Sequence, residues 1–158
     1  MKYLTILPAL IYIVLVWHKY GVQKSLTESY TRLTRKQQPL FFASFVVTCF
    51  AIIFVYLSNH FNELSNTLLV FSGFCISCSA ASAFLRDSKI IGKFHNYVVS
   101  LGFGFGYMFL ISVYGFDSVW FVVPSFLLMW IVARIDKKNS TWWCEIIGML
   151  TIWIATLI

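Results

Sequence analysis

Apolar and polar stretches alternate along the chain, and six apolar stretches stand out. They cover about residues 3–17, 40–57, 67–85, 97–114, 119–133 and 141–158. A helix needs about 20 residues to cross the hydrocarbon core of a bilayer, with a lower limit of about 17. The first and fifth stretches are short, but Trp17 and Trp120 near their ends extend them into the membrane interface. The pattern predicts an all-α integral membrane bundle of six transmembrane helices in a single domain, residues 1–158.

The first polar stretch predicts one more, shorter helix. Residues 25–28 read Ser-x-x-Glu, the capping-box pattern that opens a helix. The apolar residues that then share one helical face are Leu26, Tyr30 and Leu33. The basic residues that lie elsewhere on the helix are Arg32, Arg35 and Lys36. We predict an amphipathic interfacial helix over about residues 26–36, with these three basic residues at the lipid surface.

Basic residues are distributed unevenly between the loops. All but one of the 12 Lys and Arg residues fall in three alternate loops, 18–38, 86–96 and 134–140, and the exception is Lys2. Short cytoplasmic loops of membrane proteins retain Lys and Arg. We therefore predict that the three basic loops are cytoplasmic, that both termini lie outside, and that the membrane is a bacterial inner membrane.

Composition agrees with this class and excludes others. Hydrophobic residues make up 59% of the chain and charged residues 11%, whereas soluble domains carry about 25% charged residues. The net charge of +6 is explained by the loop bias rather than by nucleic acid. The predicted partner is the lipid bilayer.

Small residues are concentrated in the third and fourth apolar stretches. Gly73, Ser77 and Ala81 form a row at four-residue spacing, with Ser82 beside its end. Cys75, Ser79 and Ala83 form another. Gly102 and Gly106 repeat this spacing in the next stretch. Such rows let helices approach closely in lipid, so the two helices form either a dry packing seam or the lining of a path for a solute.

Few residues can carry chemistry inside the membrane. Glu145 is the one clear ionisable residue within an apolar stretch, and such groups are candidates for function. It also lies near the start of its own predicted helix, where an anion is favoured. His95 and Asp87 could join it at the inner surface, where one histidine and one carboxylate suffice for proton transfer. The topology separates His60 from the other histidines, so we expect neither a metal site nor a cofactor.

A resemblance rests on three features: the Ser-x-x-Glu-Ser-Tyr stretch at residues 25–30, the small-residue third helix, and His95 opening the fourth. In these features the chain resembles small uncharacterised six-helix bacterial membrane proteins, which are distantly similar to the ceramidase and progestin-receptor-like membrane hydrolases. That superfamily uses a Ser, an Asp and several His, including an H-x-x-x-H. The chain has no H-x-x-x-H and no histidine in its last stretch, so the resemblance assigns no catalytic residue.

Three functional hypotheses follow. The first is a non-enzymatic membrane protein that forms a homo-oligomer and forms or gates a pathway for an ion or small solute, as a pore-forming effector or small transporter does. The second is a membrane-embedded hydrolase or transferase that acts on lipid at the inner leaflet through His95, Glu145 and Asp87. The third is a partner-binding subunit of a membrane complex.

Overall fold

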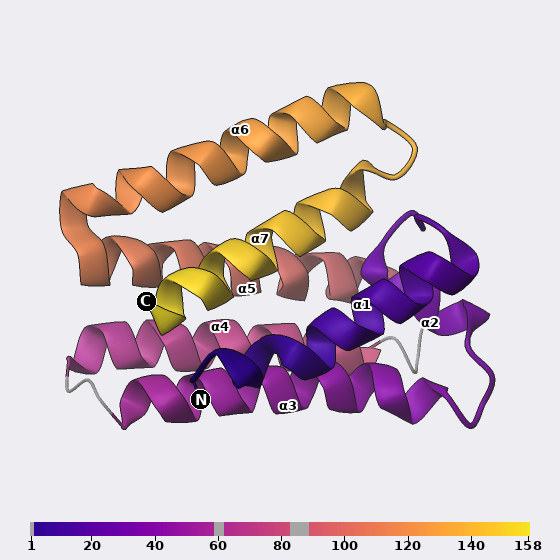
Figure 1. The fold of residues 1–158 in the computed structure, drawn as a ribbon, viewed down its shortest axis with the longest axis horizontal. Coiled ribbons are helices and arrows are strands. Elements are labelled where there is room, and N and C mark those ends of the chain that lie inside the picture. Colours follow the sequence, from indigo (N-terminus) through magenta and orange to yellow (C-terminus); the bar gives the residue numbers. More distant parts are fainter. Residues whose placement is uncertain (1, 59–61, 83–88) are drawn as a thin grey trace.

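The computed structural model describes residues 2–58, 62–82 and 89–158 of the chain. Its elements, in chain order, are η1 (Lys2–Ile6), α1 (Leu7–Tyr20), α2 (Leu26–Arg32), α3 (Gln38–Leu57), α4 (Glu63–Ser82), α5 (Lys89–Tyr114), η3 (Gly115–Ser118), α6 (Val119–Ile135) and α7 (Ser140–Leu157). Every element in these described ranges is a helix, so the all-α prediction is confirmed (Figure 1).

The number of membrane spans differs from the prediction of six. Five stretches of the described chain are long and apolar enough to cross a membrane: Tyr3–Tyr20, Gln38–Leu57, Glu63–Ser82, Phe94–Ile135 and Ser140–Leu157. This is compatible with an integral membrane protein. The count of six is not matched, because the fourth and fifth predicted segments fall in one helical run of 42 residues, Phe94–Ile135.

The chain changes direction inside that long helical run. Gly115 follows α5 with φ of +54°, a conformation that glycine adopts without the steric cost that a Cβ brings. From this turn α6 runs back toward the other end of the bundle (Figure 1). It contains 17 residues, about the minimum length for a crossing.

Helix boundaries extend beyond the apolar stretches. The fourth predicted segment begins near residue 97, whereas α5 begins at Lys89, because a helix continues through polar turns that project past the apolar part. Residues 83–85 of the third predicted segment lie outside the described residues. Pro8 and Pro39 lie in the first turns of α1 and α3, where the missing proline N–H costs no intrahelical hydrogen bond.

The predicted interfacial helix is shorter and more buried than expected. Instead of continuing to residue 36, α2 ends at Arg32, and its last turn tightens as the Leu33 N–H donates to the Tyr30 carbonyl. Arg35 and Lys36 follow in an exposed turn before α3. The sequence predicts that a helix begins here, because the capping pattern is local. The length of the helix depends on the turn that ends it, which the capping pattern does not predict.

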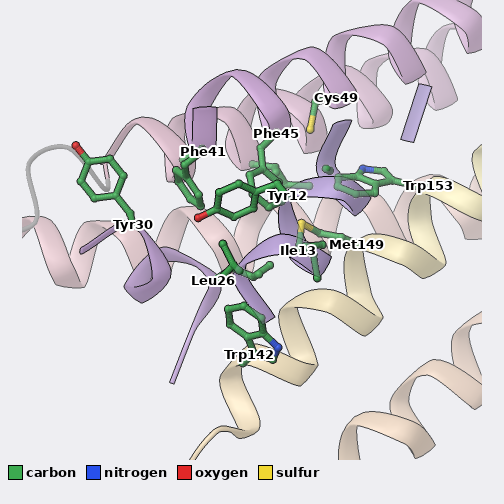
Figure 2. Close-up of a cluster of buried hydrophobic side chains, with 14 of the residues drawn as sticks. Tyr12, Ile13, Leu26, Tyr30, Phe41, Phe45, Cys49, Trp142, Met149 and Trp153 are labelled. Atoms are coloured by element: carbon green, nitrogen blue, oxygen red, sulfur yellow. The ribbon is translucent and has the colours of Figure 1, made fainter. Parts of the chain in front are cut away.

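Two side chains of α2 join the main core instead of lying on the surface. Leu26 and Tyr30 are 4% and 7% exposed, and Tyr30 packs against Phe41 of α3 with ring centroids 5.8 Å apart. Figure 2 shows both among the aromatic side chains that fill this end of the bundle. The prediction that α2 lies flat on the lipid surface is therefore wrong for its apolar face.

The arrangement of the helices places all predicted cytoplasmic loops together. α3, α4 and α5 form a layer, which α1 and α7 cross, and α6 lies outermost beside α7 (Figure 1). The end at which α1, α4 and α6 finish is also the end at which α3, α5 and α7 begin (Figure 1). We call this the basic end of the bundle, because the three Lys- and Arg-rich connections join these helix ends.

Candidate functional site

Glu145 links two segments at the basic end that are far apart in the sequence. Its side chain is 7% exposed, and its Oε2 accepts a hydrogen bond from the Leu26 N–H at 2.6 Å. The Trp142 N–H donates in turn to the Lys24 carbonyl at 3.1 Å. The first turns of α7 and the start of α2 are thus hydrogen-bonded to each other. The carboxylate binds the N-terminus of α2, rather than that of its own helix as the sequence analysis had considered.

His95 contacts two serines of α4 near the same end. Its Nδ1 lies 2.8 Å from Ser82 Oγ and 3.2 Å from Ser79 Oγ. Ser82 Oγ also donates to the Ser79 carbonyl at 2.7 Å. The structure therefore brings His95 and Ser82, both candidates from the sequence, into direct contact across the α4–α5 interface.

Ser79, which contacts His95, also lines a small cavity together with Glu145. This cavity of about 40 Å³ lies at the junction of α2, α3, α4, α5 and α7 and is large enough for a water molecule. Asp87, the third predicted member of the group, lies outside the described residues. Within the ranges that the structure describes, no three His, Cys, Asp or Glu residues gather in a way that could hold a metal ion.

In the seam between α4 and α5, Gly102 faces the predicted row that contains Cys75 and not the row that begins with Gly73. A Cβ built at Gly102 would lie 3.2 Å from Cys75 Cβ and 3.1 Å from the Ile76 side chain. A Cβ at Gly106 would contact Ile152 and lie 3.0 Å from Ser72 Oγ. The backbones of α4 and α5 therefore pack closely at both glycines.

The predicted partner row turns away from α5. A Cβ at Gly73 would meet Ile53 and Cys49 of α3, and Ala81 is exposed. The Ser77 hydroxyl is buried without a hydrogen-bond partner. The pairing of the Gly73–Ser77–Ala81 row with Gly102 and Gly106 is thus wrong, because these residues lie on two other sides of α4.

A column of serines occupies the α4–α5 seam, and only one of its members, Ser79, belongs to a row that the sequence predicts. Ser65, Ser72 and Ser79 recur every seven residues and are all buried. Ser65 Oγ lies 3.0 Å from Ser112 Oγ, and Ser72 Oγ donates to the Gly102 carbonyl at 2.8 Å. The seven-residue spacing is the signal that could have identified this face, since it brings residues to one side of a helix.

A cleft opens beside the seam, between α5, α6 and α7. Its volume is about 590 Å³, and the backbone of α6 approaches α7 more than α5. Phe103, Tyr107, Phe126 and Met129 form its apolar part. The polar residues that line it are Asn96, Ser100, Thr141 and Glu145. Because these come from the start of α5 and the start of α7, the polar groups lie toward the basic end.

Two contacts hold α6 in position across the cleft. Tyr107 of α5 stacks on Phe126 with ring centroids 5.0 Å apart, and its hydroxyl is hydrogen-bonded to Ser125. At the basic end, Asp136 accepts hydrogen bonds from the Asn139 side chain and from Trp143 Nε1. The Asn139 hydrogen bond, with a smaller contribution from Trp143, lowers the pKa of the Asp136 carboxyl below its usual value.

The predicted lipid-surface residues Arg32, Arg35 and Lys36 are all exposed at the basic end. Comparison of the chain with family models, with curated proteins and with solved structures finds no match. The features that bear on function are therefore the small cavity beside Ser79, the cleft between α5, α6 and α7, and the polar groups that line them.

Proposed function

We propose that this chain is an integral membrane protein that binds an amphiphile in the cleft between α5, α6 and α7. The observation that carries the proposal is the cleft, which is mostly apolar and has polar side chains gathered at one end. Binding pockets for small molecules have volumes of about 300–1,000 Å³ and this same distribution of groups. An acyl chain would lie along Phe103 and Phe126, and its polar end beside Asn96, Thr141 and Glu145.

Gly104 provides the test of this proposal. It lines the cleft, and a Cβ built there meets no atom within 4 Å, so Gly104→Leu should place a side chain in the cleft and reduce its volume. The purified protein would be irradiated with a fatty acid that carries a photoreactive group on its chain. We expect cross-links to peptides of α5 and α6 in wild type and a loss of most of them in Gly104→Leu.

The matched control is Leu101→Phe, which adds bulk to the same helix at a position that is 53% exposed and outside the cleft lining. It should cross-link like wild type. Unchanged cross-linking in Gly104→Leu, with the variant folded, would refute the cleft as the binding site.

We propose further that α5 and α6 cross the membrane separately, which makes six crossings. Support comes from the chain reversal at Gly115 and from the restriction of Lys and Arg to alternate loops. Both termini would then lie outside, and the basic end would face the cytoplasm of a bacterial cell.

A lipid-acting enzyme is the second candidate, and the contact between Ser82 and His95 favours it. Once Ser82 turns away from the Ser79 carbonyl, His95 Nδ1 would accept the hydroxyl proton as Ser82 Oγ attacks an ester carbonyl. The ester C–O bond would then break, the departing alcohol would take the proton from His95, and water would hydrolyse the acyl-serine to release the fatty acid. Release of fatty acid from a lipid ester by wild type, and its loss in His95→Ala, would support this candidate. Binding without turnover would leave the protein a binder.

Fewer structural observations support the pathway hypothesis and the subunit hypothesis. Serine hydroxyls in the α4–α5 seam bond to groups inside the seam, and the nearby cavity that Ser72 and Gly73 line measures about 10 Å³. A self-associating pathway would therefore need a route between copies of the chain. The molecular mass of the detergent-purified protein distinguishes a homo-oligomer from a subunit that binds a different partner.

A further inference from the structure

A further cavity shares no lining residue with the cleft between α5, α6 and α7, so the proposed amphiphile does not involve it. It has a volume of about 320 Å³ and lies between α1, the connection from α2 to α3, and the start of α3. One of its walls is Tyr12, whose hydroxyl is hydrogen-bonded to the buried Ser29 at 2.6 Å. That wall is fixed in place, because Tyr12 also packs against Phe41.

One part of this cavity is apolar and open to the surroundings of the protein. Leu15 and Leu40 line it and are 63% and 60% exposed. They lie on α1 and α3, near the ends of both helices that meet the basic loop. In a membrane these side chains face acyl chains of the surrounding lipid, so the opening is placed where a lipid tail already lies.

The other part of the cavity is basic. His18 and Lys19 line it at the end of α1, and the Lys19 ammonium lies 5.1 Å from the centroid of the Tyr20 ring. Arg35 and Lys36 occupy the exposed turn between Leu33 and Gln37, two further lining residues. None of the described residues that line the cavity is acidic. A negative group at its mouth would therefore lie beside Lys19 and near the exposed turn that carries Arg35 and Lys36.

We propose that this cavity binds one anionic phospholipid of the leaflet that the basic end faces. Its phosphate would be held between Lys19 and Arg35, with Lys36 beside it, and one acyl chain would run along Leu15 and Leu40. Lysine and arginine at the lipid headgroup level attract anionic lipids. The aromatic wall and the apolar opening provide a place for an acyl chain. These features favour a lipid over a free anion, because a free anion has no apolar part to bury.

Lipid titration followed by native mass spectrometry tests the site. The protein in detergent would be titrated with phosphatidylglycerol, with phosphatidylcholine and with glycerol phosphate. We expect one tightly bound phosphatidylglycerol, and weaker binding of the other two. Lys19→Gln combined with Arg35→Gln should weaken phosphatidylglycerol binding by at least roughly fivefold, the effect of one basic residue at the surface.

The control is Lys137→Gln combined with Lys138→Gln, which removes two exposed charges at the same end but in the α6–α7 turn. Retained binding in this control supports the site, and an equal loss in both pairs overturns it in favour of a diffuse charge effect. Binding of phosphatidylcholine as tightly as phosphatidylglycerol, or of glycerol phosphate as tightly as the lipid, also overturns it. Leu40→Trp, which reduces the opening without a change in charge, should weaken the binding of phosphatidylglycerol. It should leave the Gly104-dependent cross-linking of the fatty acid intact.

Discussion

Glu145 shows how a single side chain can join segments 119 residues apart. Its carboxylate satisfies the first backbone N–H of α2, a donor that has no partner within its own helix. When the carboxyl is ionised, this hydrogen bond is charge-assisted and stronger than one between neutral groups. Glu145 also lines the cleft. The side chain that is hydrogen-bonded to α2 would therefore lie beside the polar end of a ligand in the cleft.

Replacement of Glu145 should separate the hydrogen bond from the charge. Glu145→Ala leaves the Leu26 N–H buried without this acceptor, and the free energy of unfolding should fall by about 1–3 kcal/mol. Glu145→Gln keeps an oxygen acceptor and should lose less. Thermal unfolding in detergent measures both. Glu63→Ala, at the exposed first residue of α4, is the control and should melt like wild type. If all three variants melted at the same temperature, the hydrogen bond from Leu26 to Glu145 would not contribute to the stability of the fold.

Gly106 and Gly104 lie two residues apart on α5 and have opposite surroundings. A side chain at Gly106 meets Ile152 and Ser72, whereas one at Gly104 enters open space. Gly106→Leu should therefore separate α5 from α4 and α7, and overpacking of this kind costs about 1–3 kcal/mol. Gly104→Leu is the same substitution without the clash. We expect a lower melting temperature only for Gly106→Leu, and similar melting of the two variants would mean that the seam is open.

At the scale of elements, the turn between α6 and α7 joins two of the helices that line the cleft, and it leads into Thr141 at the polar end of the cleft. Asp136 holds this turn through Asn139 and Trp143, and its folded-state pKa is lowered. A lowered pKa contributes stability that is present above the unfolded pKa of about 3.9 and is lost as the pH falls through the folded value. The difference in melting temperature between wild type and Asp136→Asn should therefore be largest near neutral pH and shrink below about pH 4. A difference that is constant with pH would contradict this role.

Helix existence followed from sequence far better than helix contacts did. Long apolar runs predict helices because backbone groups in lipid must be hydrogen-bonded within the segment. The contacting face of such a helix is hard to predict, since apolar residues surround it and no polar stripe marks the outside. On α4 both the Gly73 row and the column that contains Ser72 consist of small residues, so residue size does not indicate which of them faces α5. The burial of α2 depends on Glu145 and on Tyr12, contacts that no local pattern contains.

At the scale of the whole molecule, the closed seam and the open cleft divide the bundle. α3, α4, α5 and α7 pack closely through glycines and hydrogen-bonded serines. α6 contributes mainly exposed side chains, and Ser125 is its one buried residue. A ligand in the cleft would therefore contact the closely packed helices α5 and α7 on one side and the mainly exposed helix α6 on the other.

The number of crossings determines on which side of the membrane the C-terminus lies. If α5 and α6 cross separately, six crossings place both termini outside. If Phe94–Ile135 crosses once, five crossings place the termini on opposite sides. The distribution of Lys and Arg favours six, because all three basic loops then face the cytoplasm. We therefore expect alkaline phosphatase fused after Ile158 to be active, since this reporter works only outside the cytoplasm.

A second position makes this test independent of the C-terminus. Phe116 lies in the turn between α5 and α6 and is 87% exposed. With six crossings this turn is outside, so a cysteine placed there in a background without the native cysteines should react with a membrane-impermeant maleimide in intact cells. A cysteine at Lys137, in a predicted cytoplasmic loop, should react only after the cells are opened. An inactive phosphatase fusion together with an unlabelled Phe116→Cys would refute six crossings, because the chain would then have to pass the Gly115 turn inside the membrane.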